Sequence, residues 1–140
     1  MSATIDAVIK DINASLPERK LIGLIERTNL SADLKALLAD LAKITVQLGG
    51  KLVAIGRKIL AFAFDLIKAF PTVTLGIIAA LVISSLIAAI PLFGGVLAAA
   101  LSSLLLVLGI STGALKDFTS DKLGARIESL VNSFSALAEI

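Results

Sequence analysis

The fold is decided by residues 69–115, which read AFPTVTLGIIAALVISSLIAAIPLFGGVLAAALSSLLLVLGISTGAL and carry no charged side chain. A helix needs roughly 20 apolar residues to cross a bilayer core of about 30 Å, so this run of 47 residues is long enough for two crossings. The segment PLFGG at 91–95 interrupts the run, because proline ends a helix and paired glycines allow the chain to reverse. The sequence therefore predicts two antiparallel hydrophobic helices over 72–90 and 96–115.

Both predicted helices are apolar on all faces, whereas a helix of a soluble bundle normally keeps one polar face. This favours a membrane hairpin over the alternative, a hairpin buried in the core of a soluble helical bundle. The predicted tip is uncharged and consists of a short loop that includes Pro91, Phe93, Gly94 and Gly95. Basic residues flank the hairpin on both sides, so the positive-inside rule predicts that both termini stay on one side of the membrane and that the tip crosses.

The whole chain is unusually apolar for its 140 residues. Hydrophobic residues make up 57% of it and charged residues 17%, against about 45–50% and about 25% in soluble domains. Apolar residues recur at helical spacing on both sides of the hairpin. We therefore expect one all-α domain over 1–140, with amphipathic helices in 1–70, the hydrophobic transmembrane hairpin in 71–115 and a C-terminal amphipathic helix in 116–140.

Serines mark the expected starts of three flanking helices. Ser15 and Glu18 fit a capping box before a short second helix that ends near residue 28. Ser31 is a good N-cap for a third segment, whose apolar stripe continues to Leu48 before two glycines weaken the helix. Ser120 is the corresponding N-cap of the last helix.

Residues 51–70 form the segment with the strongest predicted affinity for a membrane surface. Residues 43–68 carry five basic side chains against one acidic side chain, and the polar face of this predicted helix is narrow. Helices of this kind lie at a membrane interface, where basic side chains reach the headgroups. We expect membrane contact from its basic and aromatic residues, namely Lys51, Arg57, Lys58, Phe62, Phe64, Lys68 and Phe70. A helix of a soluble bundle with a thin solvent-exposed edge is the alternative.

Small residues are frequent in the hairpin, and they let helix backbones approach closely in lipid. The candidate packing positions are Gly76, Ser84, Ser102, Gly109 and Gly113, the last two forming a GxxxG motif. Packing within one hairpin is the favoured interpretation, and oligomerisation between copies is the alternative. The serines are expected to bond between helices more readily than to line an aqueous path.

The side-chain inventory argues against catalysis. The chain has no His and no Cys, so it lacks the side chains of zinc fingers, catalytic triads and thiolate nucleophiles. No phosphate-binding glycine motif is present, and the carboxylates do not cluster as in a calcium loop. Net charge is only +2, with no Tyr or Trp to stack on bases. We expect no enzyme activity, no cofactor, no metal, no small-molecule substrate and no nucleic-acid partner.

The C-terminal half combines several features of one known family. An uncharged hairpin at 72–115, with a glycine-containing tip, is followed closely by a short amphipathic helix that opens Asp121-Lys122-Leu123 and leads to Ile127 and Leu130. In these features residues 70–131 resemble the C-terminal end of pore-forming colicins. The resemblance implies a soluble helical bundle that hides the hairpin, then opens on a membrane and depolarises it. The colicin domain is longer and has more helices than this sequence predicts.

These observations leave several functions open. The first is a membrane-inserting pore-forming or depolarising protein of the toxin, bacteriocin or defence type, with a holin-like lysis protein as a variant. The second is a non-toxic integral membrane scaffold that forms oligomers. The third is a soluble bundle that ignores lipid. The first predicts residence in a membrane with two crossings after insertion from a soluble form, a partner bilayer of anionic lipid and possible homo-oligomers.

Overall fold

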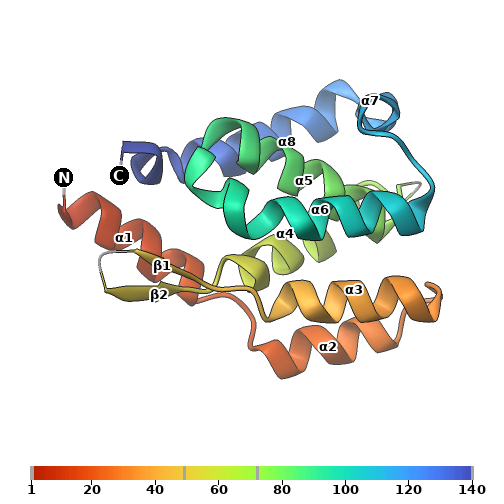
Figure 1. The fold of residues 1–140 in the computed structure, drawn as a ribbon, viewed down its shortest axis with the longest axis horizontal. Coiled ribbons are helices and arrows are strands. Elements are labelled where there is room, and N and C mark those ends of the chain that lie inside the picture. Colours follow the sequence, from red (N-terminus) through yellow and green to blue (C-terminus); the bar gives the residue numbers. More distant parts are fainter. Residues whose placement is uncertain (1, 49, 72, 140) are drawn as a thin grey trace.

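The computed structural model describes residues 2–48, 50–71 and 73–139, and within these the fold is all-α with one small β-hairpin (Figure 1). The α-helices are α1 (Ser2–Asn13), α2 (Glu18–Glu26), α3 (Ala32–Ala42), α4 (Ile55–Ala69), α5 (Leu75–Ala89), α6 (Gly94–Leu108), α7 (Thr112–Leu115) and α8 (Asp121–Ser133). Strands β1 (Val46–Leu48) and β2 (Lys51–Val53) follow α3, and the short 3-10 helices are η1 (Pro91–Phe93), η2 (Lys116–Phe118) and η3 (Ser135–Glu139). The predicted fold class is confirmed.

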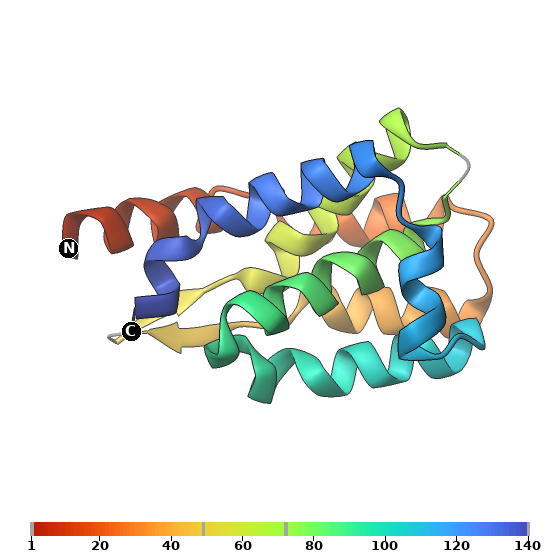
Figure 2. The same ribbon diagram turned by 90° about the horizontal axis from the view of Figure 1, so that it is seen from above.

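Helix α5 occupies the centre of the bundle. It packs against α4, α6 and α8, and Figure 2 shows it between α8 and α6. All residues from Leu75 to Ile83 are buried, together with Leu86. A helix that is hydrophobic on all sides requires such enclosure in water, and here the apolar faces of its neighbours provide it.

Helix α6 is as free of charged residues as α5 but lies at the periphery. It packs against α5 and α3, and only Leu97, Leu104 and Leu105 are buried. Figure 2 places α6 along one edge of the molecule. The two helices of the predicted hairpin therefore have different environments, one enclosed by protein and the other covered on one side only.

The boundaries of the hairpin differ from the prediction. The reversal is made by η1, and Phe93 is fully buried beneath it. Gly94 is helical (φ −57°, ψ −43°), so both tip glycines belong to α6 and do not form the turn. Helix α6 ends at Leu108 rather than 115, because Gly109 adopts a left-handed conformation (φ 71°) that terminates the helix. The start predicted at Thr72 lies outside the described residues, and α5 begins after Thr74, whose hydroxyl caps it.

The prediction of continuous helix over 31–48 is wrong. Helix α3 ends at Ala42, and an antiparallel β-hairpin follows with Val46 opposite Val53 and Leu48 opposite Lys51. β-Branched residues favour the extended conformation, and Gly50 supplies a positive φ of 81° in the turn. The predicted helix over 51–70 consequently begins only at Ile55.

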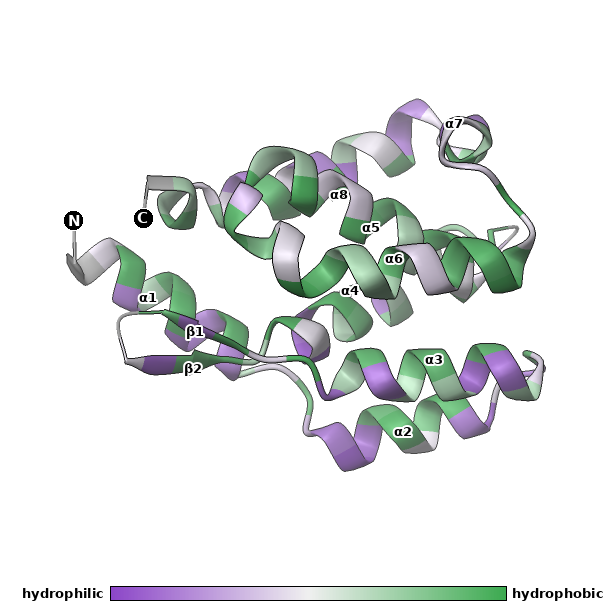
Figure 3. Ribbon diagram, in the orientation of Figure 1, coloured by the Kyte–Doolittle hydropathy of each residue, from purple (hydrophilic) through white to green (hydrophobic). Residues whose placement is uncertain are grey.

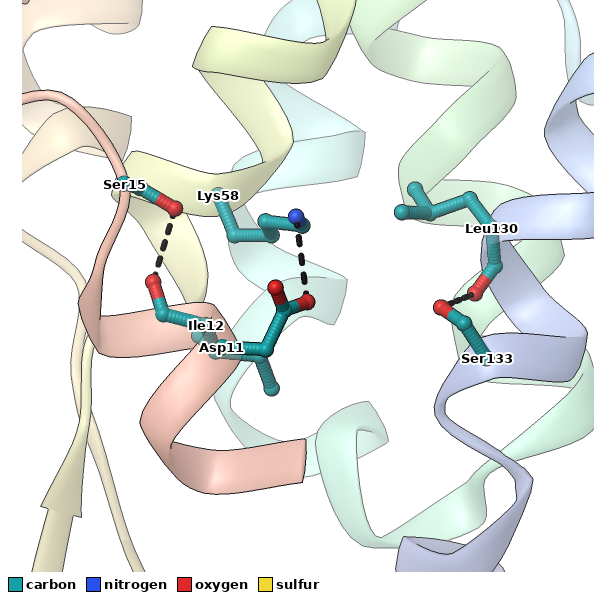
Figure 4. Close-up of polar contacts among 6 residues, drawn as sticks. All are labelled: Asp11, Ile12, Ser15, Lys58, Leu130 and Ser133. Atoms are coloured by element: carbon teal, nitrogen blue, oxygen red, sulfur yellow. Dashed lines mark hydrogen bonds and ion pairs between the residues drawn. The ribbon is translucent and has the colours of Figure 1, made fainter. Parts of the chain in front are cut away.

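Two of the three predicted serine caps are confirmed. Ser31 accepts a hydrogen bond from the Leu34 amide and Ser120 accepts one from the Leu123 amide, both at 3.2 Å. The Ser15 capping box is wrong, because the Ser15 hydroxyl instead donates to the Ile12 carbonyl oxygen at 2.7 Å (Figure 4). Pro17 is the residue before α2, and no side chain caps that helix.

Candidate membrane-contact surface

The outer face of α6 is an exposed apolar surface. We define it as η1 and α6 residues that are exposed to solvent, namely Pro91, Leu92, Gly95, Ala98, Ala99, Ser102, Leu106 and Val107. Leu106 is 82% exposed, Val107 40% and Leu92 38%. These positions recur three or four residues apart, which places most of them on one side of the helix. Figure 3 shows no strongly hydrophilic residue along α6.

Leu92 lies at one end of this surface and Leu106 and Val107 at the other, with small exposed residues between them, and an uncharged apolar face of this kind is typical of an interaction surface. The other large hydrophobic residues described as exposed are scattered: Leu16 in the connection between α1 and α2, Leu52 on β2 and Phe118 on η2. The remaining side of α6 is fixed to the bundle. The outer face of α6 is therefore the strongest candidate for contact with an apolar partner.

Length and composition distinguish the two hairpin helices. In the described part of the chain, one continuous helical stretch, Pro91–Leu108, has 18 residues and a mean hydropathy of 2.2, enough by these criteria to cross a bilayer. Helix α5 has 15 residues, which corresponds to about 22 Å. That is shorter than a bilayer core of about 30 Å, so α5 would need added turns from its flanking residues to span one.

Three of the four basic residues predicted to contact lipid are bound to α1 instead. Lys51 Nζ lies 2.8 Å from Asp6 Oδ1, and Lys58 Nζ lies 3.4 Å from Asp11 Oδ2 (Figure 4). The Arg57 guanidinium donates to three backbone carbonyl oxygens at the end of α1, those of Asn13 (3.1 Å), Ser15 (3.2 Å) and Leu16 (3.3 Å). Arg57 thus complements the negative end of the helix, and the two lysines pair with its carboxylates.

Lys68 has a different environment. Its Nζ lies 3.9 Å from Asp65 Oδ1, and both side chains are at least 70% exposed, so this pair contributes little to stability. Lys68 lies in the last turn of α4, just before the connection to α5. It is the member of the predicted basic set that is freest to meet a charged surface.

The predicted aromatic contacts are partly in the core. Phe64 is buried at 9% exposure, whereas Phe62 and Phe70 are half-buried and pack against the core. In this closed arrangement Phe64 cannot reach a membrane. Phe62 and Phe70 each present part of a ring to solvent.

The candidate packing residues do not act as one motif. Gly76 is the tightest position, because a Cβ there would lie 3.0 Å from Leu34 Cδ2 and 3.2 Å from Leu108 Cδ2, at the junction of α5 with α3 and α6. Gly109 ends α6, and a Cβ at Gly113 would meet nothing within 4 Å, so this GxxxG does not pack helices here. Ser84 is half-buried and Ser102 is exposed.

The sequence did not predict the partners of the basic residues or the role of Asn13. The backbone oxygen of Asn13 accepts from Arg57, its Nδ2 donates to the Leu52 carbonyl oxygen at 2.9 Å, and its Oδ1 accepts from the Ala54 amide at 2.8 Å. The residues that these contacts join are about 40 positions apart in the sequence, so no local sequence pattern predicts the contacts. Residues 1–42 hold nearly equal numbers of acidic and basic side chains. This indicates that carboxylates are present there, but not which basic residues they contact.

Two shallow grooves border the hairpin. One, of about 410 Å³, lies between α5 and α8, and the other, of about 240 Å³, lies between α3 and α6. Their linings are mainly aliphatic, with Glu128 and Asp40 as the ionisable residues. Within the described residues no group of three His, Cys, Asp or Glu side chains is placed to hold a metal ion.

Comparisons with known protein families, with curated protein sequences and with solved structures found no match.

Proposed function

We propose that this chain is a membrane-inserting protein that permeabilises or depolarises a bilayer through its α5–α6 hairpin. The observation that carries the proposal is the outer face of α6, an exposed uncharged surface continuous through a tight turn with a wholly apolar helix. The resemblance of residues 70–131 to pore-forming colicins supports the same activity. The proposed final state has both hairpin helices across the bilayer and both termini on one side.

Helices α5 and α6 differ in their exposure to water, and this difference affects what each would gain from contact with lipid. Helix α5 is already removed from water, so its transfer from protein to lipid changes its hydration little. The outer face of α6 is in water, and burying a leucine such as Leu106 stabilises by about 1.5–3 kcal/mol. The free energy of contact with lipid therefore favours α6 as the first element of the hairpin to enter.

Insertion also uncovers the apolar faces of the helices that enclose α5. Helices α4 and α8 are amphipathic, with Ile59 and Leu60 buried on α4 and Leu123 and Ile127 buried on α8. Such helices lie stably in the interfacial layer with their apolar faces toward the acyl chains. The bilayer thus offers a replacement for each contact that opening removes.

Anionic vesicles provide the test. Purified protein is added to vesicles of phosphatidylglycerol and phosphatidylcholine that hold a potassium diffusion potential, and collapse of the potential is followed with a voltage-sensitive dye. We expect collapse at low protein-to-lipid ratio. Vesicles that bind the protein and keep their potential contradict pore formation, and vesicles that neither bind nor leak contradict membrane action altogether.

A non-toxic oligomeric scaffold is the second candidate, and one observation favours it. Gly95, Ala98, Ala99 and Ser102 are small and exposed on one helix, which suits close contact between helices of two copies. This function predicts detergent-resistant oligomers on membranes whose potential is unchanged. The same vesicle preparation, analysed by chemical crosslinking, distinguishes it from the first.

A further inference from the structure

Helix α1 covers a set of cations that is otherwise suited to bind phosphate groups. We define the basic edge as Lys51, Arg57 and Lys58, on β2 and the first turns of α4. All three project toward α1, where two carboxylates and three carbonyl oxygens receive them. Carboxylates and carbonyl oxygens present the same kind of acceptor as the phosphate oxygens of a lipid headgroup.

The polar contacts between α1 and the basic edge are exchangeable. In the Lys51–Asp6 pair both side chains are 54% exposed, and in the Lys58–Asp11 pair Asp11 is 64% exposed. Water and salt reach such pairs, and each contributes little to stability. Arg57 donates single bonds to separate carbonyl oxygens, whereas one phosphate can accept two parallel bonds from a guanidinium.

Few apolar side chains attach α1 to the rest of the bundle. Of its described side chains only Ile9 and Ile12 are buried, with Ile5 and Val8 partly buried against the core. Its neighbours are α4, β2 and η3 (Figure 1). These four side chains recur at helical spacing on one face, so a detached α1 can lie on a bilayer surface with that face in the acyl boundary.

We infer that α1 is a displaceable cover, and that an anionic lipid surface replaces it on the basic edge. Headgroup phosphates take the positions of the Asp6 and Asp11 carboxylates at Lys51 and Lys58, and of the carbonyl oxygens at Arg57. Helix α1 then moves onto the bilayer surface, and α4 loses one of the elements that hold it in the closed bundle beside α2, α3 and α5. This inference rests on the proposed function, since it describes how a membrane opens the closed bundle.

The direct test measures the position of α1. The chain contains no cysteine, so spin labels attached at Ala7→Cys on α1 and Ala36→Cys on α3, both exposed positions, report one distance by pulsed electron resonance. We expect phosphatidylglycerol vesicles to lengthen and broaden this distance, and phosphatidylcholine vesicles to leave it unchanged. Inorganic phosphate at the same phosphate concentration is also expected to leave it unchanged.

Three results would contradict the inference, and each has a different meaning. If the protein sediments with anionic vesicles while the distance stays fixed, α1 is not a cover, although membrane binding stands. If the distance lengthens with inorganic phosphate alone, the basic edge is a site for free anions and the assignment to lipid is wrong. If the protein does not sediment with anionic vesicles, both this inference and the proposed function fail.

A pair of charge variants tests the same inference through affinity. Asp6→Asn with Asp11→Asn removes both carboxylates from the basic edge, while Glu26→Gln with Asp40→Asn changes net charge equally at exposed positions on α2 and α3. We expect the first variant to bind anionic vesicles at about fivefold lower lipid concentration than the second, given the modest strength of two exposed ion pairs. Equal binding of the two variants contradicts the inference.

Discussion

At the scale of single residues, Gly56 fixes the approach of α4 to the end of α3. A Cβ at this position would overlap the backbone carbonyl oxygen of Leu41, and the Gly56 amide donates to the Ile44 carbonyl oxygen at 3.1 Å. We expect Gly56→Ala to lower the free energy of unfolding by about 3 kcal/mol, because backbone atoms must move to accept the methyl group. Urea denaturation followed by circular dichroism measures this loss.

Gly23 provides the matched control. It lies within α2, and a Cβ there would meet nothing within 4 Å. Gly23→Ala is expected to stabilise the protein by about 0.5–1 kcal/mol, since alanine loses less conformational freedom in a helix. A Gly56→Ala protein as stable as Gly23→Ala would show that the contact between α3 and α4 is looser than described.

Asn13 joins the end of α1 to the β2–α4 connection through both atoms of its amide. Asn13→Ala removes both bonds, to Leu52 and to Ala54, and we expect a loss of about 1–3 kcal/mol. Asn13→Asp keeps the acceptor for the Ala54 amide but places a carboxylate oxygen against the Leu52 carbonyl oxygen at the negative end of α1, so its loss should be at least as large. Thermal unfolding of the three proteins checks the order, and an Asp variant as stable as the parent contradicts it.

At the scale of elements, α5 and α6 are equally free of charged residues but unequally buried. Ile78 of α5 is fully buried, and Ile78→Ala should cost about 2–5 kcal/mol because it leaves a cavity. Leu106 of α6 is 82% exposed, and Leu106→Ala should change stability by less than about 0.5 kcal/mol. Denaturant midpoints measure both, and similar losses would contradict the peripheral position of α6.

A charge added near the start of α6 should be tolerated in the folded protein but should oppose insertion into a bilayer. Gly95 is exposed in the first turn of α6, where Asp interacts favourably with the helix dipole, so Gly95→Asp should fold as well as the parent. Carrying that charge across a bilayer costs about 2.5–3.5 kcal/mol. We expect at least about a tenfold loss of vesicle depolarisation with no loss of thermal stability.

The control for Gly95→Asp is Ala32→Asp, which adds the same charge to the exposed first residue of α3. It changes net charge equally but leaves the hairpin uncharged, so depolarisation should persist. If both variants depolarise vesicles to the same extent, the α5–α6 tip does not cross the membrane.

The elements show how far sequence reasoning extends. Local signals were sufficient for the Ser31 and Ser120 caps, which depend on a hydroxyl and an amide three residues apart. The β-hairpin was missed because Leu41, Ile44 and Leu48 recur at helical spacing and extend the apolar stripe of α3 past its actual end at Ala42. Periodicity alone does not separate a helix from a strand over three residues.

At the scale of the whole molecule, tertiary packing determines which of the apolar helices is buried, and composition alone does not. The sequence predicts two equally apolar helices, and only the arrangement of α3, α4 and α8 makes α5 interior and α6 peripheral. The basic edge was predicted to face lipid, yet it faces α1 through contacts that span 41 to 47 residues of chain. Contacts at such separations have no local sequence signature.

A fluorescent probe at the hairpin tip shows directly whether the tip enters the bilayer. Leu92 is 38% exposed in η1, and Leu92→Cys can be labelled uniquely with an environment-sensitive fluorophore because the chain has no other cysteine. On adding phosphatidylglycerol vesicles, we predict a blue-shifted emission and loss of quenching by iodide in the outer solution. An emission that stays unshifted and fully quenched by iodide, with the protein bound to the vesicles, would contradict the account.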